Sequence, residues 1–239
     1  MKIALIGYGK MGKAIEEIAI KNGHEIVLKI TSQNIADFNI ENLQQADVAI
    51  EFTNPHSAVD NLNKCFDANI PVVCGSTGWL DQWQEIENYC TEKNGTLLFA
   101  SNFSVGVNIF FELNKKLAML MSNRPEYNIS IEEIHHTQKK DAPSGTAITL
   151  ADGILNNNHN KEKWVLGETA NNAELSITSK RIDPAPGTHI INYNSSIDSI
   201  EIKHTAHNRI GFASGAVLAA EFIARQESGI YSFYDILKP

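Results

Sequence analysis

Residues 132–147, which read EEIHHTQKKDAPSGTA, combine side chains that transfer protons with groups that bind anions. A histidine titrates close to neutral pH, so His135 or His136 beside Lys139 can hold a transferable proton. The Pro-Ser-Gly-Thr turn that follows predicts a helix start with Ser144 as N-cap, where free amides and hydroxyls suit a carboxylate. Each feature taken alone also suits a packed strand end or a solvated turn. Together they favour an anion pocket beside an acid.

A second stretch, GYGKMG at residues 7–12, has the spacing G-x-G-x-x-G between a short apolar run and an amphipathic helix. In that setting Gly7 makes a tight turn, Gly9 lets the backbone approach a pyrophosphate, and Gly12 allows close packing of helix and strand. The first amides of the helix would then bind the phosphates. A glycine-rich turn can be purely structural, but this position favours dinucleotide binding.

The residues that select between NADH and NADPH are ambiguous. An acid should follow the glycines by about 20 residues and bind the adenine ribose of NAD. Residues 28–34 read LKITSQN instead, with neither an acid nor an arginine. Lys29, Thr31 or Ser32 could contact the 2′-phosphate of NADPH, or could form an ordinary strand end. The sequence therefore predicts NADH or NADPH as cofactor and leaves the preference open.

Two further stretches are candidates for cofactor contact because each follows a predicted strand. EFTNPHS begins at Glu51, and CGSTGW begins at Cys74. Ligands of open parallel sheets bind outside the carboxyl ends of the strands, so these loops suggest contact with ribose or nicotinamide. Two ordinary turns are an equal alternative. The Cys74 thiol has no paired base and is interpreted as a core residue.

The first hundred residues supply the elements that would position these loops. Apolar runs alternate with stretches that suit helices, and the runs read KIALIG, EIVLKIT, DVAIEFT, IPVVCGST and TLLFAS. Near-continuous apolar strands that alternate with helices predict a parallel sheet covered on both faces.

The pattern changes after Asn102. Residues 106–121 predict one long helix, and three later runs, ELSITSKR, THIINYN and DSIEIKHTA, alternate apolar with polar residues. Such alternation is typical of an antiparallel sheet with unequal faces. The run GAVLAAEFIARQ predicts a final helix that is apolar enough to return to the first domain. We therefore predict two domains, residues 1–104 completed by 208–239, and residues 105–207.

Composition narrows the function classes. Of the 239 residues 43% are hydrophobic, and no apolar run reaches the roughly 20 residues that cross a bilayer. Glycines interrupt the first apolar run too early for a signal peptide. The net charge of −8 argues against a nucleic-acid or anionic-membrane partner. The three cysteines lack CxxC spacing, so we expect reduced thiols, a cytoplasmic location and no metal site.

The motifs resemble those of the dihydrodipicolinate reductase family of the lysine and diaminopimelate pathway. The resemblance covers essentially the whole chain and rests on GYGKMG, FTNPHSAV, CGSTGW, SNFSVGVNIFF, EEIHHTQKKDAPSGTA, PGTHII and RIGFASGAV, in that order. It implies an α/β fold with an N-terminal Rossmann domain, a doubly wound parallel sheet, and an α+β domain with an open mixed sheet. The second domain would bind substrate and form a homotetramer. The implied activity is reduction of a small dicarboxylate, hydroxy- or dihydrodipicolinate, to tetrahydrodipicolinate by NADH or NADPH.

The resemblance also implies roles by motif position. His135 would donate the proton, with Lys139 as its catalytic partner. The substrate carboxylates would be held by His136, Ser144, Gly145 and Thr146. The cofactor would lie along Gly7, Gly9, Lys10, Met11, Gly12, Thr31, Ser32, Phe52, Thr53, Gly75, Ser76, Thr77, Ala100, Ser101, Asn102 and Phe103. Two departures affect only the cofactor end. The glycine turn is one residue shorter than the family's usual form, and Thr31-Ser32 replaces an acid with a neighbouring arginine.

Two other functions compete with this interpretation. A dehydrogenase acting on an amino-acid semialdehyde would need a reactive cysteine in the second domain, but all three cysteines precede residue 102. A dinucleotide-sensing regulator would need a basic nucleic-acid-binding segment or an evident partner surface, and the acidic sequence shows neither.

Overall fold

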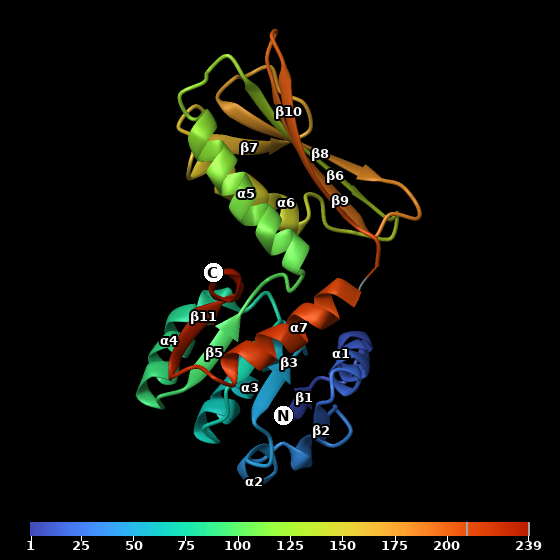
Figure 1. Ribbon diagram of the computed structural model, residues 1–239, viewed down its shortest axis with the longest axis vertical. Helices are drawn as coiled ribbons and strands as arrows, with labels where there is room; N and C mark the ends of the chain where they lie inside the picture. The colour runs from blue at the N-terminus through green and yellow to red at the C-terminus, as the bar shows by residue number, and fades with distance from the viewer. Residues whose placement is uncertain (209, 239) are drawn as a thin grey trace. The chain divides into compact units, whose positions relative to one another are not determined.

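The computed structural model describes residues 1–208 and 210–238, which form two compact units (Figure 1). Unit 1 comprises Met1–Val105 and Ile210–Pro239, and unit 2 comprises Gly106–Arg209. Two positions within the predicted domain boundaries, Arg209 and Pro239, lie outside the described residues. Within the described part of the chain, no helix is long and apolar enough to cross a membrane.

Unit 1 is built on a six-stranded parallel sheet in the order β11-β5-β4-β3-β1-β2. Its strands are β1 (Lys2–Ile6), β2 (Glu25–Ile30), β3 (Val48–Glu51), β4 (Val72–Cys74), β5 (Thr96–Phe99) and β11 (Gly229–Ser232). Its helices are α1 (Lys10–Lys21), α2 (Ile40–Leu43), α3 (Pro55–Asp67), α4 (Trp83–Glu92), α7 (Ile210–Ile223) and α8 (Phe233–Leu237), with short 3-10 turns at Ile35–Asp37 and Leu80–Gln82. The chain runs from β1 to one edge and then returns past β1 to the other, which confirms the predicted doubly wound fold.

The continuous apolar run of β1 is explained by burial on both faces of the sheet. Ala4 and Ile6 join a core cluster with residues of α3 and α4, whereas Ile3 and Leu5 join a cluster with α1 and α7. All four side chains are at most 1% exposed. A strand that buries successive residues on opposite faces cannot alternate apolar with polar residues.

Helix α7 brings the end of the chain back to unit 1, and β11 then pairs with β5. The contact is close at Gly215, where an added Cβ would lie 1.6 Å from the carbonyl oxygen of Phe103. Only glycine allows this approach of the helix to the segment after β5.

Unit 2 is a five-stranded sheet in the order β10-β9-β6-β8-β7, with two helices packed on one face. Its strands are β6 (Asn128–His135), β7 (Lys163–Leu166), β8 (Glu174–Arg181), β9 (Gly187–Asn194) and β10 (Ser199–Ala206), and its helices are α5 (Val105–Met121) and α6 (Gly145–Leu155). Strand β9 pairs antiparallel with β6 and β10, but β8 pairs parallel with β6 and β7. The mixed sheet implied by the family resemblance is confirmed. The prediction of an antiparallel sheet, made from the alternation of apolar and polar residues, is wrong for β8. Such alternation indicates that one face of a strand is buried, but it does not determine the direction of the strand.

Strand β6 determines which polar groups enter the interior of unit 2. Its residues alternate in burial, and Ile129 and Ile131 pack with α5 and α6. Side chains two apart on a strand share a face. Glu133 and His135 therefore continue the same buried row.

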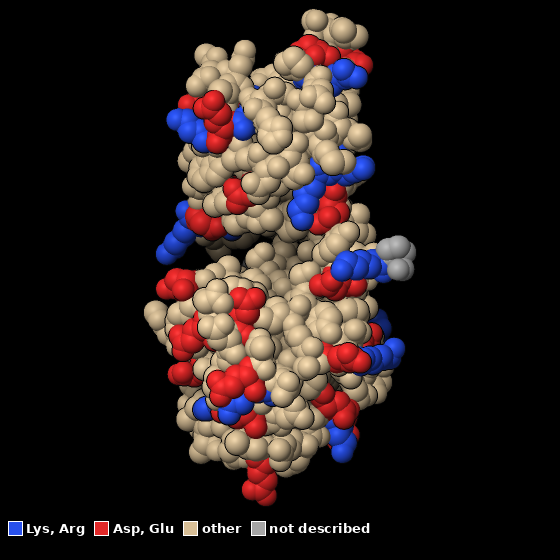
Figure 2. All heavy atoms as spheres, turned by 90° about the vertical axis from the view of Figure 1, so that its left-hand side faces the viewer, with Lys and Arg blue, Asp and Glu red and all other residues tan. Residues whose placement is uncertain are grey.

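The surface carries charges of both signs. On the face drawn in Figure 2, acidic side chains are scattered over unit 1, and the lysines and arginines lie mostly beside acidic residues. This distribution agrees with the net charge of −8.

Candidate active site

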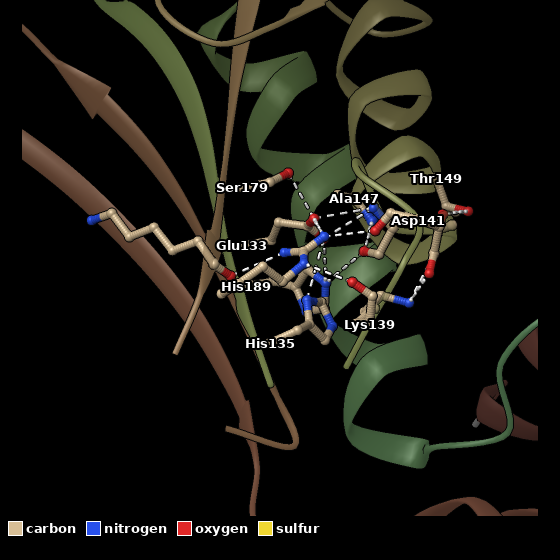
Figure 3. Close-up of polar contacts among 12 residues, drawn as sticks. Glu133, His135, Lys139, Asp141, Ala147, Thr149, Ser179 and His189 are labelled. Atoms are coloured by element: carbon tan, nitrogen blue, oxygen red, sulfur yellow. Dashed lines mark hydrogen bonds and ion pairs between the residues drawn. The ribbon is translucent and has the colours of Figure 1, made fainter. Parts of the chain in front are cut away.

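Glu133 and His135 place two buried polar side chains together inside unit 2 (Figure 3). Glu133 is fully buried and His135 is 7% exposed. His135 Nδ1 lies 3.5 Å from Glu133 Oε2, which is an ion-pair distance. Among the described residues this nitrogen has no hydrogen-bond partner. The two side chains thus form a buried acid and imidazole pair.

The Glu133 carboxylate accepts hydrogen bonds from three directions. The Ser144 amide donates to Oε1 and Oε2 at 3.2 and 3.1 Å, the Ser179 hydroxyl to Oε1 at 2.7 Å, and Arg181 Nη2 to Oε1 at 3.2 Å. Burial alone would raise the pKa of Glu133, but these donors together lower it below its usual value. The carboxylate therefore stays ionised in the interior.

A second buried histidine, His189 of β9, packs against His135. The two rings meet edge to face with centroids 5.1 Å apart. His189 Nε2 lies 3.3 Å from Ser144 Oγ and 3.8 Å from Glu133 Oε2. Burial, with a smaller effect from its neighbour His135, lowers the pKa of His189 to about 4, so the ring is neutral at neutral pH.

The pKa of His135 lies below its usual value. Burial lowers it, and the nearby charge of Glu133 offsets only part of that shift. The atoms of Glu133, His135 and His189 that could hold a metal ion lie within 4.8 Å of one another. The carboxylate is already matched by the Arg181 guanidinium, however, which disfavours a further cation. The cluster is better suited to holding and releasing a proton.

The N-terminus of α6 has the geometry of an anion site. Ser144 is the N-cap, and its Oγ accepts a hydrogen bond from the Ala147 amide at 3.2 Å. The first amides of a helix have no intrahelical partner, so those of Gly145 and Thr146 are suited to a carboxylate. Gly145 is exposed, and an added Cβ there would meet nothing within 4 Å. The space beside these amides is therefore open.

The loop between β6 and α6 holds the other two candidate residues. Lys139 Nζ pairs with both carboxylate oxygens of Asp141, at 2.9 and 2.8 Å. Arg181 ties the loop down by donating to the carbonyl oxygens of Lys139 and Asp141 at 3.3 and 2.6 Å. His136 is half-buried, and among the described residues its Nδ1 has no hydrogen-bond partner. The loop thus holds an ammonium group that is paired with Asp141 and a buried imidazole nitrogen that lacks a hydrogen-bond partner among the described residues.

Unit 1 contains a cavity of about 660 Å³ at the carboxyl ends of β1, β2 and β3. Six of the candidate cofactor residues line it, namely Gly7, Gly9, Thr31, Ser32, Phe52 and Thr53. The lining also includes Tyr8, Ile35, Asn54, Ser57 and Asn61, which the sequence interpretation did not select. The cavity lies where ligands of doubly wound sheets bind.

The three glycines of the G-x-G-x-x-G stretch have different steric surroundings. Gly7 has φ +94°, and an added Cβ would lie 2.1 Å from the carbonyl oxygen of Phe52. At Gly12 an added Cβ would lie 2.3 Å from the Gly7 oxygen. At Gly9, the N-cap of α1, an added Cβ would meet nothing within 4 Å. The space at the helix N-terminus is therefore open, whereas Gly7 and Gly12 are tightly packed. This arrangement suits a pyrophosphate that is bound by the first amides of the helix.

The remaining candidate cofactor residues do not line this cavity. They lie at the start of α1 and after β4 and β5, and they are Lys10, Met11, Gly12, Gly75, Ser76, Thr77, Ala100, Ser101, Asn102 and Phe103. Contacts of side chains and backbone connect the strand ends: the Thr53 amide donates to Ser76 Oγ at 2.8 Å, and the Phe52 ring lies 5.4 Å from the Phe103 ring. An added Cβ at Gly75 would lie 2.1 Å from the Phe52 ring.

At the far end of the cavity the candidate residues are held by local contacts. Asn34 Oδ1 accepts hydrogen bonds from the Thr31 amide and hydroxyl at 2.7 and 2.8 Å. Lys29, one alternative for a 2′-phosphate contact, pairs with Glu16 at 3.2 Å and lies over the Tyr8 ring. The lysine is thus already engaged with a carboxylate.

Several polar groups of the site were not predicted from the sequence. Glu133 could have been predicted, because an acid two residues before a histidine on the same strand lies on the same face. Ser179, Arg181 and His189 reach the site from β8 and β9 through strand pairing, which the sequence does not specify. In unit 1, buried Glu51 accepts from the Thr53 amide at 3.1 Å and from Asn61 Nδ2 at 3.2 Å.

The three cysteines are buried and unpaired. Burial raises the pKa of each thiol, that of Cys90 to about 11. Thiols in this state are poor nucleophiles. This agrees with the interpretation of Cys74 as a core residue.

The comparisons with known proteins cover both units. The family model described as dihydrodipicolinate reductase, N-terminus, matches residues 1–103, and that described as dihydrodipicolinate reductase, C-terminus, matches residues 106–237.

Individual relatives agree with the family models. The chain is 49% identical over 241 residues to a 4-hydroxy-tetrahydrodipicolinate reductase of Christiangramia forsetii, covering 99% of this chain and 98% of the relative. It is 35% identical over 240 residues to the enzyme of the same name from Methanosarcina acetivorans, covering 98% and 88%. Among solved structures, a dipicolinate-bound dihydrodipicolinate reductase from Paenisporosarcina sp. TG-14 matches with a TM-score of 0.78 at 22% identity, over 97% of each chain.

Proposed function

The chain belongs to the dihydrodipicolinate reductase family, and we propose how its residues carry out the reaction. The activity is that of an NADH- or NADPH-dependent 4-hydroxy-tetrahydrodipicolinate reductase of the lysine and diaminopimelate pathway. Reduction of this substrate adds a hydride and a proton and releases the hydroxyl group as water, leaving tetrahydrodipicolinate. We assign residues 1–104 with 208–239 to the cofactor, and residues 105–207 to the substrate and to self-association.

One observation carries the assignment of residues in unit 2. A buried carboxylate and imidazole, Glu133 and His135, lie against the residue that caps the open N-terminus of α6. The arrangement places a proton donor beside an anion site. A substrate with two carboxylates and a reducible ring requires both. Gly145, Thr146 and His136 hold carboxylate oxygens in this proposal, with Ser144 as the cap that orders the turn.

The cofactor end fits a dinucleotide, which supplies the hydride when bound. The Gly9 turn and the first amides of α1 hold the pyrophosphate. Thr31 and Ser32 contact the adenosine ribose, and the remaining candidate residues after β3, β4 and β5 line the nicotinamide half. The acid is His135, which transfers its proton to the ring from Nε2. Lys139 provides positive charge beside the carboxylates.

Self-association as a homotetramer is part of the same proposal. In the described part of the chain, the sheet of unit 2 carries helices, α5 and α6, on one face only, and its other face includes half-buried Ile134 and Ile190. A sheet face with apolar side chains and no helix over it suits a subunit contact. Three reduced, buried cysteines suit a cytoplasmic location.

The test is an initial-rate assay on the freshly generated product of the preceding synthase, with NADH and with NADPH. We expect cofactor oxidation that depends on this product. The variant His135→Gln should lower kcat by about 10²- to 10⁴-fold, the usual contribution of a general acid. Its dissociation constants for NADH and NADPH should equal those of the wild type, because His135 lies outside unit 1.

The matched control is His159→Gln, which changes an exposed histidine of the same unit. Its rate should equal that of the wild type. No substrate-dependent oxidation by the wild type, or full activity of His135→Gln, would contradict the proposal.

A further inference from the structure

We propose that Glu133 is a positioning residue that couples the proton donor to the substrate anchor, because its single carboxylate holds both the His135 ring and the Ser144 turn. The inference rests on the proposed function and adds a residue to it. Glu133 is fully buried, so in this proposal it touches neither substrate nor cofactor and acts through His135 and Ser144.

The first contact determines which nitrogen of His135 faces the ligand. Nδ1 lies 3.5 Å from Glu133 Oε2 and has no hydrogen-bond partner among the described residues. An imidazole nitrogen that faces a carboxylate carries a hydrogen, which leaves Nε2 to exchange the transferred proton. The separation exceeds the roughly 2.7–3.2 Å of an N–H···O bond. The contact is therefore electrostatic, and it strengthens when the ring takes its second proton.

The other edge of the His135 ring is kept clear by a glycine. An added Cβ at Gly187 would lie 3.2 Å from Nε2 and 3.3 Å from Cδ2. Gly187 is the first residue of β9, in the PGTHII stretch. The missing side chain leaves room at the nitrogen that the carboxylate does not occupy.

The second contact fixes the anion site. The Ser144 amide donates to both oxygens of Glu133, at 3.2 and 3.1 Å. Ser144 is the residue immediately before the Gly145 and Thr146 amides and caps their helix. Any movement of the carboxylate therefore shifts the acid and the carboxylate-binding amides together.

The charge of Glu133 also sustains the proton on His135. The groups that face this ring are Glu133 on β6, Arg181 on β8, His189 on β9, and Lys139 and Asp141 in the loop. Of these, Lys139 and Arg181 lower its pKa, while Glu133 and Asp141 raise it. Glu133 is fully buried, whereas the Asp141 side chain is 58% exposed and is screened by water. Glu133 is thus the main counter-charge.

The test compares Glu133→Gln, which keeps the length of the side chain but removes its charge, with Glu133→Asp, which keeps the charge but shortens the reach. A protonated acid is active below its pKa, and removing a neighbouring negative charge lowers that pKa. For Glu133→Gln we expect kcat to fall by about 10- to 100-fold. The decline of kcat with rising pH should move to lower pH. The dissociation constant of dipicolinate should rise, and those of NADH and NADPH should not change.

Glu133→Asp should lower kcat and weaken dipicolinate binding while leaving the pH of that decline unshifted. A carboxylate that only stabilised the fold would change the melting temperature without moving the pH profile. The matched control is Glu168→Gln, which changes an exposed glutamate of the same unit, outside the strands of its sheet. This control should keep the wild-type kcat, pH profile and dipicolinate affinity.

A wild-type pH profile and dipicolinate affinity in Glu133→Gln overturn the inference. If Glu133→Gln shows no cooperative melting transition, Glu133→Asp provides the test instead. Wild-type kcat together with wild-type dipicolinate affinity in Glu133→Asp would then overturn the inference. An inactive wild type refutes the proposed function, whereas an active wild type with fully active Glu133 variants refutes only this inference.

Discussion

Replacing Gly9 by alanine should separate cofactor binding from folding in unit 1. Gly9 has φ −83° and ψ −152°, an extended conformation open to alanine, and an added Cβ meets nothing within 4 Å. Exchange of glycine for alanine at a compatible position stabilises a protein by about 0.4–1 kcal/mol. We therefore expect the melting temperature of Gly9→Ala to stay constant or rise slightly.

The effect on binding should be large, because in the proposed cofactor site the new methyl group enters the open space at the N-cap of α1, where the pyrophosphate would bind. Loss of one hydrogen bond to a charged phosphate costs about 1.5–3 kcal/mol. Since about 1.4 kcal/mol corresponds to a factor of ten, the dissociation constants of NADH and NADPH should rise by about 10- to 150-fold.

Isothermal titration calorimetry with each cofactor and thermal unfolding measure the two effects separately. Gly12→Ala is the matched comparison, because its Cβ would lie 2.3 Å from the Gly7 oxygen and must displace backbone. Such overpacking costs about 1–3 kcal/mol, so this variant should lose stability as well as binding. Wild-type affinity for both cofactors in Gly9→Ala would refute the pyrophosphate assignment. A melting temperature as low as that of Gly12→Ala would refute the steric reasoning.

Three further predictions concern single side chains. Ser144→Ala removes the N-cap of α6 and should destabilise the protein by about 1 kcal/mol in urea unfolding, with weaker binding of dipicolinate. Gly215→Ala, whose Cβ would lie 1.6 Å from the Phe103 oxygen, should destabilise it by at least about 1–3 kcal/mol, measured the same way. The pKa of His189 is lowered from 6.5 to about 4 in the fold, so its contribution to stability is complete above pH 6.5 and is lost as the pH falls towards 4. In urea unfolding, the free energy of unfolding of the wild type should fall over this pH range by at most about 1.4 kcal/mol per pH unit because of His189. This part of the pH dependence should be absent in His189→Gln.

The architecture of unit 1 was predictable because its signals are local and agree with one another. Apolar runs, helical stretches and the spacing of Gly7, Gly9 and Gly12 each depend on residues close together in the sequence. Strand β11 was missed, because its four residues, GIYS, show neither alternation nor a long apolar run. Its pairing with β5 depends on the return of α7.

The candidate site of unit 2 was only partly predictable for a related reason. The loop from His135 to Thr146 is contiguous, so its chemistry is visible in the sequence. Arg181 and His189 join it only through the register of β8 and β9 against β6. Strand direction follows from connectivity and packing, which explains the error over β8 and why its arginine was not connected with the loop.

The interrupted course of unit 1 affects how the chain is made. Residues 106–209 are continuous and are complete once they leave the ribosome, whereas the Rossmann sheet waits for the segment from Ile210 onward. Until α7 arrives, the side of the sheet that carries Ile3 and Leu5 lacks one of its two covering helices, and β5 is an exposed edge. Unit 2 can thus fold before unit 1 is complete during synthesis, and a nascent chain stalled near residue 208 would display an apolar surface that chaperones recognise.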